Sequence, residues 1–194
     1  IEDVKITEHG VEFTCIDGKE PVGICGSGIL AVLKELIRTG LVRKNGAFVK
    51  KENIPEEDYR YPMIRMNGKK REFLICEAPE LVVTQGDIRQ VQLAKGAILS
   101  GFLALLNKAG ISMEELDKVM IAGQFGAHLP AESLTGTGIL PKKVEDKIIY
   151  VGNSSKTGAY MTLLSEQVKE EMEGLAERME YIELAETENY EKIF

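Results

Sequence analysis

Apolar and polar positions in the first 44 residues follow the pattern of a hairpin and then a helix. Alternating apolar residues predict two strands, Val4–Thr7 and Val11–Ile16, joined by a turn at His9-Gly10. After Cys25, apolar residues recur every three or four positions and stop before Gly40, which predicts a helix with a glycine cap. We interpret residues 1–44 as the start of a larger lobe.

The pattern weakens between residues 45 and 83. Charged and proline-containing sequence from Asn45 to Arg71 predicts a solvated connection. Strands are expected only at Phe73–Cys76 and Leu81–Thr84, where apolar residues gather again. We therefore interpret residues 45–83 as a small inserted or connecting subdomain.

Residues 84–194 alternate between helices and strands. Thr84, followed by Asp87 three positions later, is typical of a helix start, and this helix is expected to run to about Lys108. Two buried strands are expected at Lys118–Ala122 and Lys147–Val151. Further short elements are predicted as a helix at Ser112–Glu115, a helical turn at Pro130–Leu134, helices after Gly152 and Ser165, and a strand at Tyr181–Leu184. This alternation predicts an α/β lobe with parallel strands.

Composition and charge narrow the class of protein. The 194 residues are 44% hydrophobic, which is sufficient for a substantial core. A net charge of -7 and a pI near 5.1 argue against a nucleic-acid surface. The three cysteines are widely spaced without a C-x-x-C motif, which favours reduced thiols in a cytoplasmic protein over zinc or iron–sulfur ligands. Apolar runs such as Ala97–Leu106 are too short to span a bilayer, and the start at Ile1 leads us to expect a longer parent protein.

The two predicted strands of the last lobe end in glycines, Gly123 and Gly152. Ligands of open α/β sheets lie beyond the carboxyl ends of strands, so both turns are expected to face one cleft. Lys156-Thr157 suggests a Walker-type phosphate loop, but Ser155 and Tyr150 stand where that motif needs glycine. The turn still offers free backbone N–H groups that suit an anion. A tight turn without a ligand would demand Gly123 equally well.

Three interpretations of Gly26-Ser27-Gly28 stay open. With Ala31 the stretch fits the dinucleotide motif G-x-G-x-x-G/A, although Pro21 and Gly23 argue against the buried strand that should precede it. The glycines could instead permit a tight turn and close helix packing. They could also form a phosphate-approach loop at a helix start, with Ser27 as a side-chain donor.

The remaining polar candidates give weaker signals. Arg89 and Lys95 on the long predicted helix are explained most simply as part of a solvated face. His9 and His128 have no carboxylate or cysteine at ligand spacing, so no metal site is predicted from them.

Five blocks of sequence, taken in order, resemble one protein family. The blocks are ICGSGIL at 24–30, TQGDIRQVQLAKGAI at 84–98, AGQFGAHL at 122–129, GILP at 138–141 and GNSSKTGA at 152–159. The family that they resemble is that of the ATP-dependent reductive activators of corrinoid proteins, whose large carboxy-terminal domain belongs to the sugar kinase, heat-shock protein and actin (ASKHA) superfamily. The resemblance implies an α/β fold, one ribonuclease-H-like half of an actin- or sugar-kinase-like ATPase domain, with a mixed sheet flanked by helices and a small inserted subdomain.

The resemblance also implies where a nucleotide would bind. Gly123, Gln124, Phe125 and Gly126 match the segment that contacts adenosine. The turn from Gly152 through Asn153 and Ser154 to Gly158 matches a connecting segment that shapes a hinge and the nucleotide wall, so that Lys156 need not touch a phosphate. Arg89 and Lys95 would flank the nucleotide, and the glycine turn Gly26, Ser27 and Gly28 is a further candidate contact.

Several features of such an activator are missing from these 194 residues. No D-x-G-T element is present, so the catalytic acid and the Mg²⁺ ligands are expected upstream, as is the [2Fe-2S] cluster of the parent protein. The chain would then be the carboxy-terminal part of the nucleotide-binding domain and alone inactive.

The implied activity is reduction of an inactive Co(II) corrinoid protein to the Co(I) state that accepts a methyl group. ATP would drive the conformational change that makes this reduction possible. The expected partner is the corrinoid protein of a methyltransferase system, and a homodimer is a further expectation. Two alternatives remain: another kinase of the same superfamily, or a nucleotide-binding interaction domain without turnover.

Overall fold

The computed structural model describes residues 1–123 and 129–187. Its first elements are an antiparallel hairpin of β1 (Asp3–Thr7) and β2 (Gly10–Thr14), followed by helix α1 (Gly26–Arg38), as the apolar spacing predicted. Gly40 follows the helix in the left-handed conformation, with φ of 74°, and so serves as the expected cap.

Buried polar contacts join α1 to the outer edge of β1. The backbone N–H of Ile6 donates to Glu35 Oε2 at 2.9 Å, and Arg38 Nη2 donates to the carbonyl of Ile6 at 2.7 Å. Arg38 also donates to Glu35 Oε2 at 2.6 Å, so the buried carboxylate is fully paired. The two side chains therefore satisfy backbone groups at Ile6 that no neighbouring strand satisfies.

A second antiparallel sheet follows, in the order β3, β4, β5. Its strands are β3 (Ile64–Asn67), β4 (Lys70–Cys76) and β5 (Leu81–Thr84). The last two were predicted, whereas β3 was missed because Arg65 and Asn67 interrupt its short apolar pattern. Phe48 and Phe73 are buried in the same core as Val4 and Leu36, so this sheet, the hairpin and α1 share one hydrophobic core.

The second half begins with α2 (Gln85–Ala109), which is the long helix that the sequence predicted. Thr84 and Asp87 form its capping box, and Gly110 ends it with φ of 67°. The chain then forms β6 (Val119–Ala122) and β7 (Ile148–Gly152), which pair in parallel. The helices of this half are α3 (Ala131–Gly136), α4 (Ser154–Leu164) and α5 (Glu166–Glu177).

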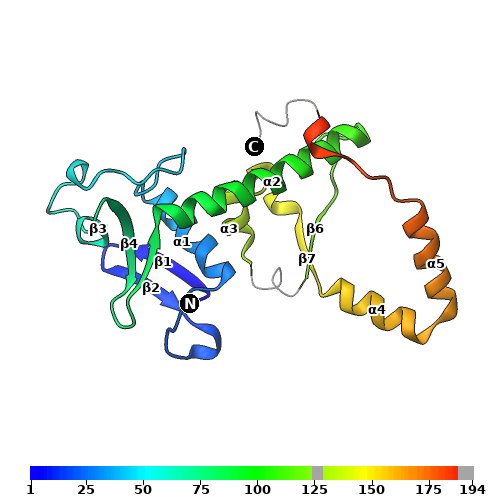
Figure 1. Cartoon of the computed structure of the whole chain (residues 1–194), viewed down its shortest axis with the longest axis horizontal. Helices are drawn as coiled ribbons and strands as arrows, with labels where there is room; N and C mark the ends of the chain where they lie inside the picture. Colours follow the sequence, from blue (N-terminus) through cyan, green and yellow to red (C-terminus); the bar gives the residue numbers. More distant parts are fainter. Residues whose placement is uncertain (124–128, 188–194) are drawn as a thin grey trace.

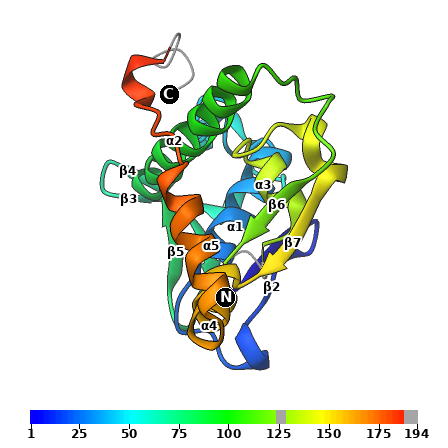
Figure 2. The ribbon, with the colours of Figure 1, turned by 90° about the vertical axis from the view of Figure 1, so that its right-hand side faces the viewer.

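Figure 1 shows how these elements are arranged. Helix α2 runs lengthwise along the upper side, with the hairpin and the second sheet at one end and the α4–α5 pair at the other. Figure 2 shows β6 and β7 side by side, with α1 and α3 behind them. Leu30 of α1 and Leu134 of α3 belong to a second core, against which Val119, Ile121 and Ile148 pack.

Three sequence predictions fail. Only half of the predicted capping box at Ser112 forms: its N–H and its hydroxyl both donate to the Glu115 carboxylate, whereas the Glu115 N–H donates to the Ser112 carbonyl, and only a turn follows. The predicted strand at Tyr181–Leu184 does not form, because no neighbouring strand pairs with it among the described residues; residues 181–183 are irregular and Leu184 begins a 3-10 helix. The strands β6 and β7 are not buried on both faces, since Met120 is 63% exposed.

None of the described helices has the length and apolar character needed to cross a membrane. Short 3-10 helices complete the described structure. The 3-10 helices are Ile16–Gly18, Lys51–Asn53, Tyr61–Met63, Lys142–Lys147 and Leu184–Glu186.

Candidate functional site

The carboxyl ends of β6 and β7 bring two of the predicted glycines together. The N–H of Gly123 donates to the carbonyl of Gly152 at 2.8 Å. Gly123 has φ of +100° and Gly152 has φ of +68°, a conformation that side chains disfavour. A Cβ added at either glycine would meet no described atom within 4 Å. As far as the described residues go, both glycines therefore present bare backbone with free space beside it, at one edge of the parallel sheet.

The turn after β7 is held by Asn153. Its side-chain Oδ1 accepts a hydrogen bond from the N–H of Lys156 at 3.0 Å, so Asn153 is the N-cap of α4. The Thr157 hydroxyl donates to the carbonyl of Asn153 at 3.2 Å. Ser154 is the first residue of the helix, where backbone N–H groups lack intrahelical acceptors. The capping contact fixes this turn beside the glycine pair.

The remaining residues of the predicted adenosine segment, Gln124, Phe125 and Gly126, lie outside the described residues. Their contribution to a site stays a prediction. Of that segment, only Gly123 is placed.

The glycine turn before α1 is closely packed. A Cβ at Gly28 would lie 2.4 Å from the carbonyl oxygen of Ile1 and 2.9 Å from Cγ2 of Ile24. Ser27 is only 3% exposed, and its hydroxyl oxygen lies 3.1 Å from the sulfur of Cys25. These contacts support the packing interpretation of Gly28, whereas a nucleotide contact from Gly26, Ser27 or Gly28 stays a prediction.

Cys25 precedes the first residue of α1, and this position affects its thiol. Burial acts to raise the pKa of the Cys25 thiol, but hydrogen bonds from the Ser27 hydroxyl and from the N–H groups of Gly28 and Ser27 outweigh it. The pKa therefore lies below its ordinary value, as expected for a thiol at a helix start.

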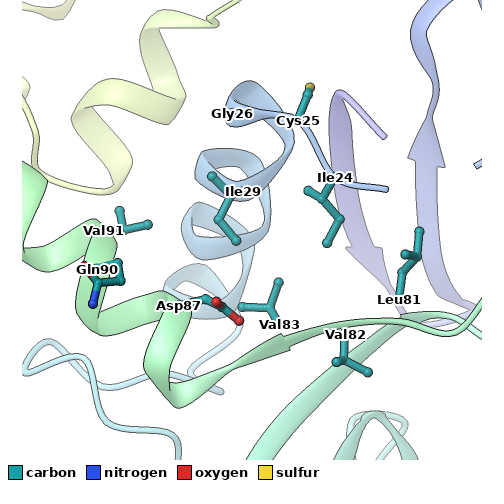
Figure 3. Close-up of a pocket in the computed structure, with 10 residues that line it drawn as sticks. All are labelled: Ile24, Cys25, Gly26, Ile29, Leu81, Val82, Val83, Asp87, Gln90 and Val91. Carbon is teal, nitrogen blue, oxygen red and sulfur yellow. The ribbon is translucent and has the colours of Figure 1, made fainter. Parts of the chain in front are cut away.

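A groove of about 490 Å³ lies between the start of α1, strand β5 and the first turn of α2 (Figure 3). Its lining is mainly apolar, with Cys25, Asp87 and Gln90 as its polar side chains. The Asp87 carboxylate already accepts hydrogen bonds from the N–H and the hydroxyl of Thr84, at 2.8 and 2.7 Å. This groove was not predictable from the sequence, because its apolar residues follow the same spacing as core residues and Asp87 has the position of a helix-capping residue.

Arg89 and Lys95 lie on α2, away from the glycine pair. Arg89 is exposed, and the Lys95 ammonium lies beside the turn after α3, where a Cβ at Gly138 would be 2.6 Å from Lys95 Nζ. In Figures 1 and 2, α2 follows the upper side of the molecule, while the carboxyl ends of β6 and β7 lie at the lower side. The described residues thus bring Gly123, Gly152 and Asn153 together but not the two cations.

Metal ligands do not gather in the described part of the chain. No group of three or more His, Cys, Asp or Glu residues lies there in an arrangement that could hold a metal ion. Cys15, Cys25 and Cys76 are free thiols.

Comparison with known proteins identifies the family. The model of the C-terminal domain of RACo, the ASKHA domain, matches residues 1–194. The corrinoid activation enzyme RamQ of Eubacterium limosum is 33% identical over 178 residues, which cover 86% of this chain and 29% of RamQ. The [Co(II) methylated amine-specific corrinoid protein] reductase of Methanosarcina barkeri is 24% identical over 179 residues, covering 91% of this chain and 29% of the reductase.

A solved structure shares the fold. The reductive activator for corrinoid, iron–sulfur protein superposes with a TM-score of 0.85 at 32% identity, over 99% of this chain and 31% of the activator. The chain thus spans less than a third of the length of these relatives. It belongs to the family of the RACo C-terminal ASKHA domain, as the sequence resemblance predicted.

Proposed function

We propose that this chain forms the carboxy-terminal part of the ATP-binding domain of a longer protein, which reduces an inactive Co(II) corrinoid protein to Co(I). The observation that supports nucleotide binding is the hydrogen-bonded pair of Gly123 and Gly152, with bare backbone facing open space beyond a parallel sheet. The relatives support the corrinoid partner, because two are named for corrinoid activation and one for reduction of a Co(II) corrinoid protein.

The residues at the end of the sheet fit one side of a nucleotide. Because neither glycine carries a side chain, a flat ring could lie against the backbone of Gly123 and Gly152 at van der Waals distance. Asn153 keeps its side chain turned into the cap of α4, so its role is to hold the turn in place. Gln124, Phe125 and Gly126 would complete the adenosine side. A flanking role for Arg89 and Lys95 on α2 stays a prediction, because the described residues do not bring them beside the glycine pair.

The remaining functions are assigned to the amino-terminal part of the full-length protein. We place there the Mg²⁺ ligands, the catalytic acid and the [2Fe-2S] cluster, and the three free cysteines here are too far apart in sequence for a ligand motif. Bound ATP would supply the free energy for the conformational change that makes cobalt reduction possible. This chain would shape the nucleotide pocket and part of the surface that meets the corrinoid protein.

Calorimetric titration of Mg-ATP into the full-length protein tests this proposal. Gly152→Ala adds a methyl group where the nucleotide would lie. Gly110→Ala is the matched control, because Gly110 has nearly the same φ, +67°, and equally open space, but lies at the end of α2. Gly152→Ala should weaken ATP binding at least about tenfold, or about 1.4 kcal/mol, while Gly110→Ala should leave it unchanged. Equal effects of the two variants would mean that backbone strain, and not a ligand contact, is the cause.

A further inference from the structure

A small hollow lies where α1, the turn after α1, helix α2 and the turn after α3 meet. Its volume is about 30 Å³, against about 490 Å³ for the groove at the start of α1. Sites for drug-sized ligands measure roughly 300–1,000 Å³, so this hollow has room for one small group and not for a nucleoside. The apolar part of its wall consists of Leu33, Ile37, Val42, Ile88 and Val91.

The polar part of the wall carries three positive charges and no negative one. Its side chains are those of Arg43, Lys44, Gln92, Lys95 and Thr137. Such a group of cations is unexpected in a chain with 31 acidic and 24 basic residues. The Thr137 hydroxyl already donates its hydrogen to the carbonyl of Ser133, at 2.6 Å. The groups that can donate to a ligand are therefore one guanidinium, two ammonium groups and one amide.

The three cations differ from the other basic groups of the chain in their pairing. Guanidinium groups elsewhere, such as those of Arg38 and Arg60, lie 2.6 Å from a carboxylate oxygen. Arg43, Lys44 and Lys95 form no ion pair with any residue that the structure describes. Arg43 and Lys44 are exposed to water, but Lys95 is half-buried. A charge that is partly removed from water is costly unless it is paired, so Lys95 favours a counter-charge in the hollow.

Hydrogen bonds hold the turn after α1 in place beside α2. The N–H of Arg43 donates to the carbonyl of Ala47 at 2.9 Å, which closes the turn. Gln85, the first residue of α2, donates from its side-chain amide to the carbonyl of Gly46 at 2.7 Å. The turn that carries two of the cations is therefore tied to the helix that carries the third.

Two glycines make room for the polar side chains of α2. Gly46 and Gly138 both have φ of +78°, a conformation that side chains disfavour. A Cβ at Gly46 would overlap the side-chain amide of Gln92, and a Cβ at Gly138 would lie 2.6 Å from Lys95 Nζ. The ends of Gln92 and Lys95 thus lie against bare backbone, one at each turn. Both turns and α2 therefore contribute to one cluster of donors.

We propose that this hollow is a binding site for a small tetrahedral oxyanion of the phosphate class, held by Arg43, Lys44, Gln92 and Lys95. Guanidinium and ammonium groups form charge-assisted hydrogen bonds to phosphate oxygens, and these are stronger than hydrogen bonds between neutral groups. The bound anion would neutralise three charges that repel one another and would join α2 to the turn after α1. The site is separate from the glycine pair at the ends of β6 and β7, so it does not depend on a nucleotide there.

Equilibrium dialysis of radiolabelled orthophosphate against the full-length protein, at constant ionic strength, tests the proposal. Lys5→Gln is the matched control, because it removes the same charge from an exposed position on β1. One orthophosphate should bind per chain in a saturable manner. Arg43→Gln and Lys95→Gln should each weaken this binding at least about tenfold, since each removes a charged donor. Lys5→Gln should leave it unchanged.

A competition arm identifies the source of the phosphate group. Orthophosphate should stay bound when Mg²⁺ and a non-hydrolysable ATP analogue are added at saturating concentration. Displacement by the analogue would assign the anion to the nucleotide site and overturn the proposal, as would the absence of saturable binding or an equal effect of Lys5→Gln. Gly152→Ala should not alter orthophosphate binding, so a failure of the nucleotide proposal and a failure of this one give different results.

Gln92→Glu gives a second readout, because it places a carboxylate of nearly the same shape among the three cations. A ligand that binds only the folded state raises the unfolding midpoint, so orthophosphate should raise the midpoint of the unmodified protein but not that of the variant. In phosphate-free buffer the variant should unfold at a higher temperature than the unmodified protein, since its carboxylate takes the place of the anion. A lower midpoint in that buffer, or a midpoint that still rises with orthophosphate, would contradict the proposal.

Discussion

Replacing Gly28 by alanine should destabilise the protein, although glycine-to-alanine changes inside a helix usually do the opposite. Gly28 lies in the first turn of α1, where the helix crosses the start of the chain. The added Cβ would lie 2.4 Å from the carbonyl oxygen of Ile1, about 1 Å short of an ordinary van der Waals contact. That carbonyl accepts a hydrogen bond from the Cys25 N–H at 3.0 Å, so it cannot move away from the new methyl group without weakening this hydrogen bond.

The size of the effect follows from three contributions. Overpacking of a close contact costs about 1–3 kcal/mol, and loss of the hydrogen bond costs about 0.5–1.5 kcal/mol. Replacing a helical glycine by alanine stabilises the folded state by about 0.5–1 kcal/mol. The net expectation is a loss of about 2 kcal/mol, or roughly 4–8 °C in the unfolding midpoint of a domain of this size.

Urea and thermal unfolding, followed by circular dichroism, measure this difference. Gly101→Ala on α2 is the matched control, because its Cβ would meet only Leu184 Cδ1, at an ordinary 3.7 Å. This control should gain about 0.5–1 kcal/mol. If Gly28→Ala were as stable as Gly101→Ala, close packing would not explain the glycine, and a ligand contact would become the better explanation.

Further predictions concern caps and buried charge. Glu35→Gln should cost about 1–3 kcal/mol at neutral pH, since the charged hydrogen bonds to Arg38 weaken. Burial acts to raise the pKa of the Glu35 carboxyl, but Arg38 and the Ile6 N–H outweigh it and lower the pKa below its ordinary 4.5. The stabilisation that the ionised Glu35 carboxylate provides is therefore fully present above pH 4.5 and is lost as the pH falls below it. The Glu35→Gln variant should accordingly lose less free energy of unfolding between pH 5 and pH 3 than the unmodified protein does. Urea unfolding at the two pH values measures this difference. Thr84→Ala should remove the N-cap of α2 and cost about 1 kcal/mol, and an unchanged unfolding midpoint would contradict that role.

Elements with a strong local pattern were predictable from the sequence. The hairpin, α1 and α2 combine regular apolar spacing with their own caps, at Gly40 and at Thr84 with Asp87. Local signals fail where pairing decides the structure. Strand β3 exists because β4 lies beside it, and Tyr181–Leu184 has β-forming residues but no partner strand among the described residues.

The site was predictable only in part. Glycines after two strands indicated the pair at Gly123 and Gly152, because parallel strands end at the same edge of a sheet. The packing role of Gly28 was one of three open interpretations, since its contact with Ile1 spans 27 residues of sequence that no local pattern connects. The exposure of Met120 and Leu163 was not predicted either. An apolar pattern identifies the face of a helix or strand that is suited to burial, but it does not show whether other residues of the same chain pack against that face.

The most direct test of the proposed role is reduction of a Co(II) corrinoid protein by the full-length protein, with a chemical one-electron reductant supplying the electron, followed by the absorption change of the cobalt centre with and without Mg-ATP. We expect that Co(I) forms only when ATP is present, that Gly152→Ala slows its formation, and that Gly110→Ala does not. Equal reduction with and without ATP, or equal rates for both variants, would contradict a nucleotide site at the ends of β6 and β7.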